Sequence, residues 1–263
     1  MGRIFAIMSG KGGVGKSTLA AALAEFYARQ GMRVTLVDGD VGLRCADLML
    51  NLQDQVVYDL GDLAEKRCAL EQALVPAGQA GLSLLAAPQL MRASDLKGKG
   101  LAKIIECLAG RQDIVLLDAP AGIGRGLKNL LGAAGQPVLV ATPDDVSVRD
   151  AERLSALLAQ RGEMHPGIIF NRVNCRMVKT GEMPPPDRLA AALDLPLVGI
   201  LPESREIYRA LLRHETALHC GDRRVLSGIE IIASRLLGAD TPLPEYAPSP
   251  VWRFFARGGE RKA

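Results

Sequence analysis

Short apolar runs alternate with predicted helices along most of the chain. The first run covers residues 3–8, and an Ala- and Leu-rich stretch over 17–30 predicts the helix that follows it. Because the runs are apolar at nearly every position, they are typical of parallel strands that are buried on both faces. We therefore predict an α/β fold with a mostly parallel central sheet and helices on both faces. Further strands are predicted at residues 33–37, 82–86, 113–117, 137–141, 167–170 and 197–201.

The length of the chain suits one such domain with an appended tail. With 263 residues, the chain is long enough to bury a large α/β core over residues 1–240, whose last predicted helix covers 223–237. Residues 241–250 contain four prolines, which exclude a long helix and predict a linker. Residues 251–263 then form a separate tail.

A complete phosphate-binding loop, GxxxxGK(S/T), lies between the first strand and the first helix. Gly12, Gly13 and Gly15 let backbone N–H groups turn inward around phosphates, because no side chain blocks the approach. Lys16 is expected to reach the β and γ phosphates, and the Ser17 hydroxyl is expected to bind Mg²⁺. The order of strand, loop and helix predicts a P-loop NTPase. Its phosphate-binding residues are Gly10, Lys11, Gly12, Gly13, Val14, Gly15, Lys16, Ser17 and Thr18.

Aspartates follow the second and fourth predicted strands. Ligands of parallel sheets bind at the carboxyl ends of strands, so these carboxylates are expected near the phosphates. Asp118 ends a Walker B-like strand and is expected to support Mg²⁺ through water. Asp40 is the candidate for orienting the attacking water, because phosphoryl hydrolysis depends on positioning more than on a strong base. Asp38 either contacts Mg²⁺ or hydrogen-bonds the loop that follows it.

A second lysine inside the loop, Lys11, carries a family resemblance. The sequence KGGVGKST resembles the deviant Walker A loop of the MinD/ParA group of ATPases. The resemblance implies that Lys11 crosses a dimer interface to touch the nucleotide of the other subunit, so that catalysis by Lys11, Lys16 and Asp40 requires two chains. Segments 38–48 and 143–157 extend the resemblance over nearly the whole chain.

The resemblance also implies where the base binds. Asn171 and Arg172 stand where the family places an asparagine against the adenine amino group, and Pro202 and Glu203 supply backbone that packs around the base. A turn-forming role is the other reading of Asn171. The chain lacks an NKxD sequence, which disfavours guanine. ATP with Mg²⁺ is the expected cofactor pair.

The tail, residues 251–263, differs in character from the domain. It holds the single Trp of the chain and two of the five Phe, and its four basic residues and one acid give it a net charge of +3. Aromatic rings beside arginines suit the interface of an anionic membrane, and family members end in such a helix. Packing onto its own domain is the other reading. The residues expected to contact the membrane are Val251, Trp252, Arg253, Phe254, Phe255 and Arg257.

Composition and cysteine spacing argue against several other classes of protein. A net charge of +3, spread along the chain, gives no strong case for nucleic-acid binding, although it does not exclude DNA. The five cysteines lack CxxC spacing, which argues against zinc, iron–sulfur and disulfide frameworks and fits a reducing cytosol. No apolar run approaches the roughly 20 residues that a membrane-spanning helix needs. We expect a cytoplasmic protein that is peripheral on the inner face of the cell membrane.

These features predict an ATPase that forms a homodimer when ATP is bound, attaches to membrane, and acts as a spatial switch in bacterial division-site selection. The resemblance implies two partner proteins, a division inhibitor and a stimulator of ATP hydrolysis. Three other functions stay open: a flagellar-number regulator of the same group, a ParA-type DNA-partitioning ATPase, and a scaffold that binds ATP without hydrolysing it.

Overall fold

A computed structural model describes residues 1–41, 44–89, 98–124, 127, 135–160, 162 and 166–244, with the side chains of 98 and 99 left out. The strands are β1 Arg3–Met8, β2 Val34–Asp38, β3 Leu74–Pro76, β4 Leu82–Leu85, β5 Ile114–Asp118, β6 Gln136–Ala141, β7 Gly167–Val173 and β8 Leu197–Pro202. The helices are α1 Lys16–Arg29, α2 Ala46–Met49, α3 Leu60–Ala64, α4 Leu70–Ala73, α5 Gly98–Ala109, α7 Asp145–Ala159, α8 Cys175–Thr180, α9 Pro186–Ala192, α10 Arg205–Leu211, the 3₁₀ helix η1 Ala217–His219 and α11 Arg223–Leu236.

The described strands form one sheet in the order β3-β4-β2-β5-β1-β6-β7-β8. Every neighbouring pair is parallel except β3 and β4. The strand order reverses direction on either side of β1, and ligands of such sheets bind at the carboxyl ends of strands around this point. The phosphate loop follows β1 and therefore lies at the expected position.

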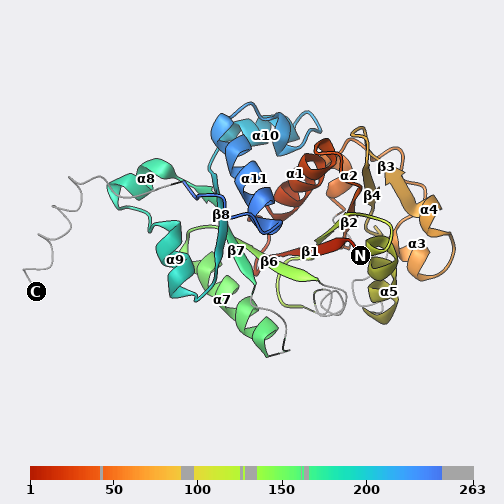
Figure 1. The fold of residues 1–263 in the computed structure, drawn as a ribbon, viewed down its shortest axis with the longest axis horizontal. Helices are drawn as coiled ribbons and strands as arrows, with labels where there is room; N and C mark the ends of the chain where they lie inside the picture. The colour runs from red at the N-terminus through yellow and green to blue at the C-terminus, as the bar shows by residue number, and fades with distance from the viewer. Residues whose placement is uncertain are drawn as a thin grey trace, which may run out of the picture.

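Two hydrophobic cores, one on each face of the sheet, explain why the strands are apolar throughout. Phe5 and Ile7 of β1 pack into the core that α1 and α11 cover, whereas Ala6 and Met8 face the core that α5 and α7 cover (Figure 1). Helix α1 is nearly all buried, and the Tyr27 hydroxyl donates a hydrogen bond of 2.9 Å to the Ala233 carbonyl of α11. The predicted α/β fold with helices on both faces is confirmed.

Element boundaries agree with the prediction to within one residue at most strands. Strand β7 is longer than predicted: it continues past residue 170 to Val173 through an irregular register with β8. The edge strand β3 was not predicted, because three residues are too short for a periodic signal, and Pro76 stands at the sheet edge, where a missing N–H does no harm. The helices α2, α3, α4, α8 and α9 are also too short to be read from periodicity.

The predicted linker and tail lie mostly beyond the described structure. Residues 241–244 have neither helix nor strand, while 245–250 of the linker and the tail residues Val251, Trp252, Arg253, Phe254, Phe255 and Arg257 fall outside the described residues. Among the described helices, none combines the length and apolar character needed to cross a membrane.

Candidate nucleotide-binding site

The phosphate loop joins the end of β1 to the start of α1. Gly13 and Gly15 have φ angles of 80° and 89°, in the left-handed region that favours glycine. A Cβ atom on Gly15 would stand 2.2 Å from Nδ2 of Asn171, so a side chain is excluded there by space as well. Because Gly15 is the N-cap residue and has no capping side chain, the first N–H groups of α1 are left to a ligand such as phosphate.

Lys16 is buried and bonded to the Walker B acid. Its ammonium lies 2.5 Å from Oδ1 of Asp118 and 3.4 Å from Oγ of Ser17, and the side chains of Lys16 and Asp118 are 5% and 1% exposed. The lysine thus sits between the two residues predicted to hold the metal. To bind a phosphate, the Lys16 ammonium has to move away from Asp118 or donate hydrogen bonds to Asp118 and the phosphate at the same time.

The donor set around Lys16 suits Mg²⁺. Asp118 Oδ2 is buried and has no hydrogen-bond partner among the described residues. Mg²⁺ takes oxygen ligands and usually binds through one or two protein groups together with phosphates and water. Across the described ranges, no group of three or more His, Cys, Asp or Glu side chains is arranged to hold a metal ion by itself. The unpartnered oxygen of Asp118 and the hydroxyl of Ser17 therefore fit a Mg²⁺ ion that also takes phosphate and water oxygens.

Asp38 lies beside Asp118, because the two residues are register partners at the ends of β2 and β5. Burial first, and then the charge of Asp118, raises the pKa of Asp38 to about 7. Its Oδ1 accepts the Asp40 N–H at 2.9 Å and its Oδ2 accepts the Ala46 N–H at 3.1 Å. Both oxygens of Asp38 thus hold the segment that follows β2, which was one of its two predicted roles; contact with Mg²⁺ stays a prediction.

Asp40 follows Asp38 by two residues and is tied to it by the hydrogen bond from its own N–H. The residue is half-buried, and burial raises its pKa, while the nearby Lys16 charge lowers it and Asp118 raises it. The charges of Lys16 and Asp118 thus both act on the Asp40 carboxylate. Gly42 and Leu43 of the same switch segment lie outside the described residues.

Lys11 is held in a different environment from Lys16. Its ammonium lies 3.2 and 3.4 Å from the two carboxylate oxygens of Asp144, and the side chains are 35% and 48% exposed. Asp144 is also the N-cap residue of α7, where its Oδ1 accepts the Ser147 N–H at 3.0 Å. A surface ion pair of this kind contributes about 0–1 kcal/mol, so Lys11 is released at little cost.

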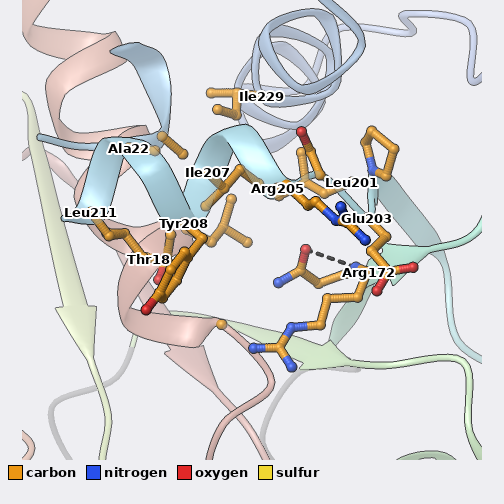
Figure 2. Close-up of a pocket in the computed structure, with 16 residues that line it drawn as sticks. Thr18, Ala22, Arg172, Leu201, Glu203, Arg205, Ile207, Tyr208, Leu211 and Ile229 are labelled. Atoms are coloured by element: carbon orange, nitrogen blue, oxygen red, sulfur yellow. Dashed lines mark hydrogen bonds between the residues drawn. The ribbon is translucent and has the colours of Figure 1, made fainter. Parts of the chain in front are cut away.

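A pocket of about 290 Å³ adjoins the phosphate loop. It brings together Thr18 of α1 with Asn171, Arg172, Pro202 and Glu203, which are the residues predicted to surround the base (Figure 2). The buried Asn171 is fixed in place, because its Nδ2 donates to the Val14 carbonyl at 2.7 Å and its Oδ1 accepts the Arg172 N–H at 2.8 Å. Arg172 itself has a left-handed φ of 57°.

Two contributors to the site were not predicted from the sequence. Asp144 has the sequence signature of a helix N-cap, but nothing in that signature points to Lys11, which is far away in the chain. Helix α10 supplies Ile207, Tyr208 and Leu211 to the pocket wall. Its apolar residues are typical of core packing, so sequence alone gave no reason to separate those that face the pocket.

Comparison with known families accounts for this arrangement. The family model described as the CobQ/CobB/MinD/ParA nucleotide binding domain matches residues 5–217. The chain belongs to this family. The family model matches most of the ATPase domain, whereas the resemblance noted from the sequence depended on individual motifs.

Individual relatives of this family extend over nearly the whole chain. The septum site-determining protein MinD of Helicobacter pylori is 36% identical over 254 residues, which cover 94% of each chain. The MinC:MinD cell division protein complex of Aquifex aeolicus has a MinD-like fold with a TM-score of 0.84 at 32% identity, covering 93% of this chain and 99% of the other. The septum site-determining MinD of Pyrococcus horikoshii, complexed with Mg-ADP, has a TM-score of 0.80 at 25% identity, covering 92% and 100%.

The chain is therefore a P-loop ATPase of the MinD/ParA type that uses ATP and Mg²⁺. The predicted fold, nucleotide class and role in division-site selection are confirmed through its septum site-determining relatives. The names of these relatives favour division-site selection over the flagellar and DNA-partitioning alternatives.

Proposed function

We propose that this chain is a division-site selector in which ATP pairs two subunits through Lys11 and thereby controls attachment to the membrane and binding of a division inhibitor. The observation that carries the proposal is the contrast between two lysines of one loop. Lys16 is buried against Asp118, whereas Lys11 is only partly buried, and Asp144 is the partner of its ammonium among the described residues. Lys16 is therefore placed to act in the nucleotide site of its own subunit, and Lys11 is placed to contact the nucleotide of another subunit.

Within one subunit, the described residues divide the work of hydrolysis. The loop N–H groups and Lys16 bind the β and γ phosphates, and Asn171, Arg172, Pro202 and Glu203 surround the base. Ser17 and Asp118, through water, hold Mg²⁺, which neutralises phosphate charge when bound. Asp40 orients the water for attack. Asp38 keeps the Asp40 segment in register with the site through its two backbone hydrogen bonds.

Between subunits, Lys11 exchanges one anionic partner for another. In the single chain its ammonium is bonded to Asp144, and in the pair it contacts the nucleotide phosphates of the other subunit. The exchange leaves Asp144 with the Ser147 N–H and the Thr142 hydroxyl, at the start of α7. The neighbouring Val146 of α7 is 64% exposed, which supports this helix as the surface for partner proteins.

Replacing Lys11 by Ala is expected to keep the chain monomeric with ATP while leaving ATP affinity within about threefold, because the exposed lysine contributes little to its own site. Light scattering coupled to size-exclusion chromatography measures the mass with ATP and with ADP. Asp144→Asn is the matched variant: Asn caps a helix as well as Asp, but without the charge that holds Lys11. We expect Asp144→Asn to dimerise at least as readily as the unaltered chain. ATP-dependent dimers of Lys11→Ala would contradict the proposal.

The partner proposed for this surface is a division inhibitor. The supporting comparison is the MinC:MinD complex of Aquifex aeolicus, whose fold this chain shares. A second partner is proposed to stimulate hydrolysis. Measuring phosphate release in the presence of lipid and both partners distinguishes this ATPase from a scaffold that binds ATP without hydrolysing it. The scaffold would release no phosphate.

The membrane part of the proposal assigns residues 1–240 to the ATPase domain, 241–250 to a linker and 251–263 to a membrane-binding tail. One short amphipathic helix binds membranes weakly, but two tails on a dimer raise the effective concentration and strengthen binding by roughly a hundredfold. The protein is then cytoplasmic as a monomer and peripheral on the inner membrane face as a dimer.

Deleting residues 251–263 is expected to abolish sedimentation with anionic vesicles in ATP, because the deleted segment carries the aromatic rings and the net charge of +3. The unaltered chain is expected to sediment with ATP and to stay in the supernatant with ADP. Neutral phosphatidylcholine vesicles serve as the lipid control, and dimerisation of the truncated chain in ATP shows that its domain is intact. Equal sedimentation in ATP and ADP, or undiminished sedimentation after the deletion, would rule the proposal out.

A further inference from the structure

One aromatic side chain on the wall of the nucleotide pocket lacks a role in the site as described so far. Tyr208 lines the pocket from α10, yet 66% of its surface is exposed. Figure 2 shows its ring on the side of the pocket that α10 forms, away from Arg172. A large aromatic group left this open beside a pocket has most of its apolar surface available to a ligand.

The position of Tyr208 on α10 separates it from the residues that hold the helix in the fold. Ile207 packs against the core that α1 and α11 form, and Ala210 is fully buried. Leu212, one turn beyond Tyr208, is 63% exposed and does not line the pocket. Tyr208 therefore stands at the boundary between the buried face of α10 and solvent, where its ring is open to an occupant of the pocket.

Both ends of α10 are anchored, so the ring is presented in a fixed place. At the start, the Ser204 hydroxyl accepts the Glu206 N–H at 3.3 Å and donates to Asp222 at 2.9 Å. After the end, a ring nitrogen of His214 lies 3.2 Å from the Leu48 carbonyl of α2. A preorganised aromatic group loses little entropy when a ligand packs on it.

The chemistry of the pocket indicates which part of the ligand meets this ring. Among the other described lining residues of α1, β8 and α10, Arg205 is charged, whereas Leu19, Ala22, Leu201 and Leu211 are aliphatic, so Tyr208 is the aromatic group of the described pocket wall. A planar base or a ribose face packs well on an aromatic ring, whereas phosphates bind the N–H groups and lysine of the loop. The ring is thus suited to the nucleoside and not to the phosphates.

We infer that Tyr208 is a nucleoside-positioning residue, whose ring packs against the base or ribose of the bound adenine nucleotide and completes the wall opposite Arg172. The inference rests on the proposed placement of the nucleotide in this pocket. It assigns Tyr208 a part in nucleotide affinity and none in the cleavage of the γ phosphate. The phenolic hydroxyl is not required for packing, so Phe is expected to replace Tyr208.

Calorimetric titration of the full chain with Mg-ADP and with Mg-pyrophosphate tests this role, because pyrophosphate lacks the nucleoside. Tyr208→Ala is expected to weaken ADP about three- to tenfold and to leave pyrophosphate affinity unchanged. Tyr208→Phe and the matched variant Leu212→Ala are expected to bind both ligands like the unaltered chain. With ATP, Tyr208→Ala is expected to raise KM by a similar factor and to keep kcat.

Unchanged ADP affinity in Tyr208→Ala, an equal loss for pyrophosphate, or a loss in Tyr208→Phe as large as in Tyr208→Ala would each overturn the inference. Failure of the unaltered chain to bind ADP would instead overturn the proposed function on which it rests. The melting temperature without nucleotide is expected to be the same in Tyr208→Ala, because the side chain is mostly exposed. A large fall in that temperature would show that Tyr208 supports the fold and would also overturn the inference.

Discussion

Replacing Lys16 by Ala is expected to weaken ATP binding by roughly 100-fold, because two charge-assisted hydrogen bonds to phosphate are lost. The same change is expected to destabilise the protein without nucleotide. Lys16 is the close counter-charge of Asp118, which is buried next to Asp38. Removing one partner of a buried ion pair costs about 3–5 kcal/mol. Urea unfolding measures the stability, and displacement of a fluorescent nucleotide measures the affinity.

A double variant separates these two effects. Lys16→Ala with Asp118→Ala removes both charges of the buried pair, so we expect it to unfold at a higher urea concentration than Lys16→Ala alone. It is still expected to fail in ATP binding. Lys103→Ala, an exposed lysine of α5, is the control for the loss of a lysine. A Lys16→Ala protein as stable as the control, or one that binds ATP normally, would refute the assigned role.

Replacing Asp40 by Ala is expected to lower phosphate release by about 100- to 1,000-fold while ATP affinity stays within a few fold, because the carboxylate acts on the attacking water and not on the nucleotide. ATP-dependent dimers and membrane attachment are then expected to persist, since hydrolysis ends both in the proposed cycle. Phosphate release in the presence of lipid is the primary measurement, and vesicle sedimentation over time is the second.

The matched control for this change is Asp54→Ala, an exposed aspartate of the same half of the chain. Asp40→Ala does not remove the hydrogen bond between the Asp40 N–H and Asp38, because that bond uses the backbone. Loss of ATP binding in Asp40→Ala, or turnover close to that of Asp54→Ala, would contradict the assigned role.

Sequence predicted those parts of the fold in which local chemistry decides the structure. The buried strands, α1 and the phosphate loop all follow from runs of apolar or glycine residues, and the structure places them as predicted. Edge strand β3 and short helix α2 could not be predicted, because each is too short to give a periodic signal. Strand β3 is fixed by its pairing with β4. In α2, the Ala46 N–H donates to Asp38, and the Leu48 carbonyl lies 3.2 Å from a ring nitrogen of His214, which is far away in the chain.

Those residues of the candidate site that belong to local sequence motifs could also be predicted. Motif positions identified Lys16, Asp118 and Asn171, and the sheet topology brings them together. The pairing of Lys11 with Asp144 could not be predicted, because it joins two loops at the ends of strands β1 and β6, and their adjacency emerges only from the order of the sheet. The raised pKa of Asp38 likewise depends on β2 lying beside β5.

The direction of α11 sets where the linker starts. Its N-cap residue Asp222 accepts the Ser204 hydroxyl near the nucleotide end of the sheet, while the Leu236 carbonyl at its other end accepts a hydrogen bond from Arg3, where β1 begins. The helix therefore carries the chain about 20 Å away from the nucleotide pocket. A Pro-rich linker of ten residues spans about 30 Å when extended, which exceeds this distance by about 10 Å. In the proposed membrane-bound dimer, that reach sets how far from the membrane the paired ATPase domains stand.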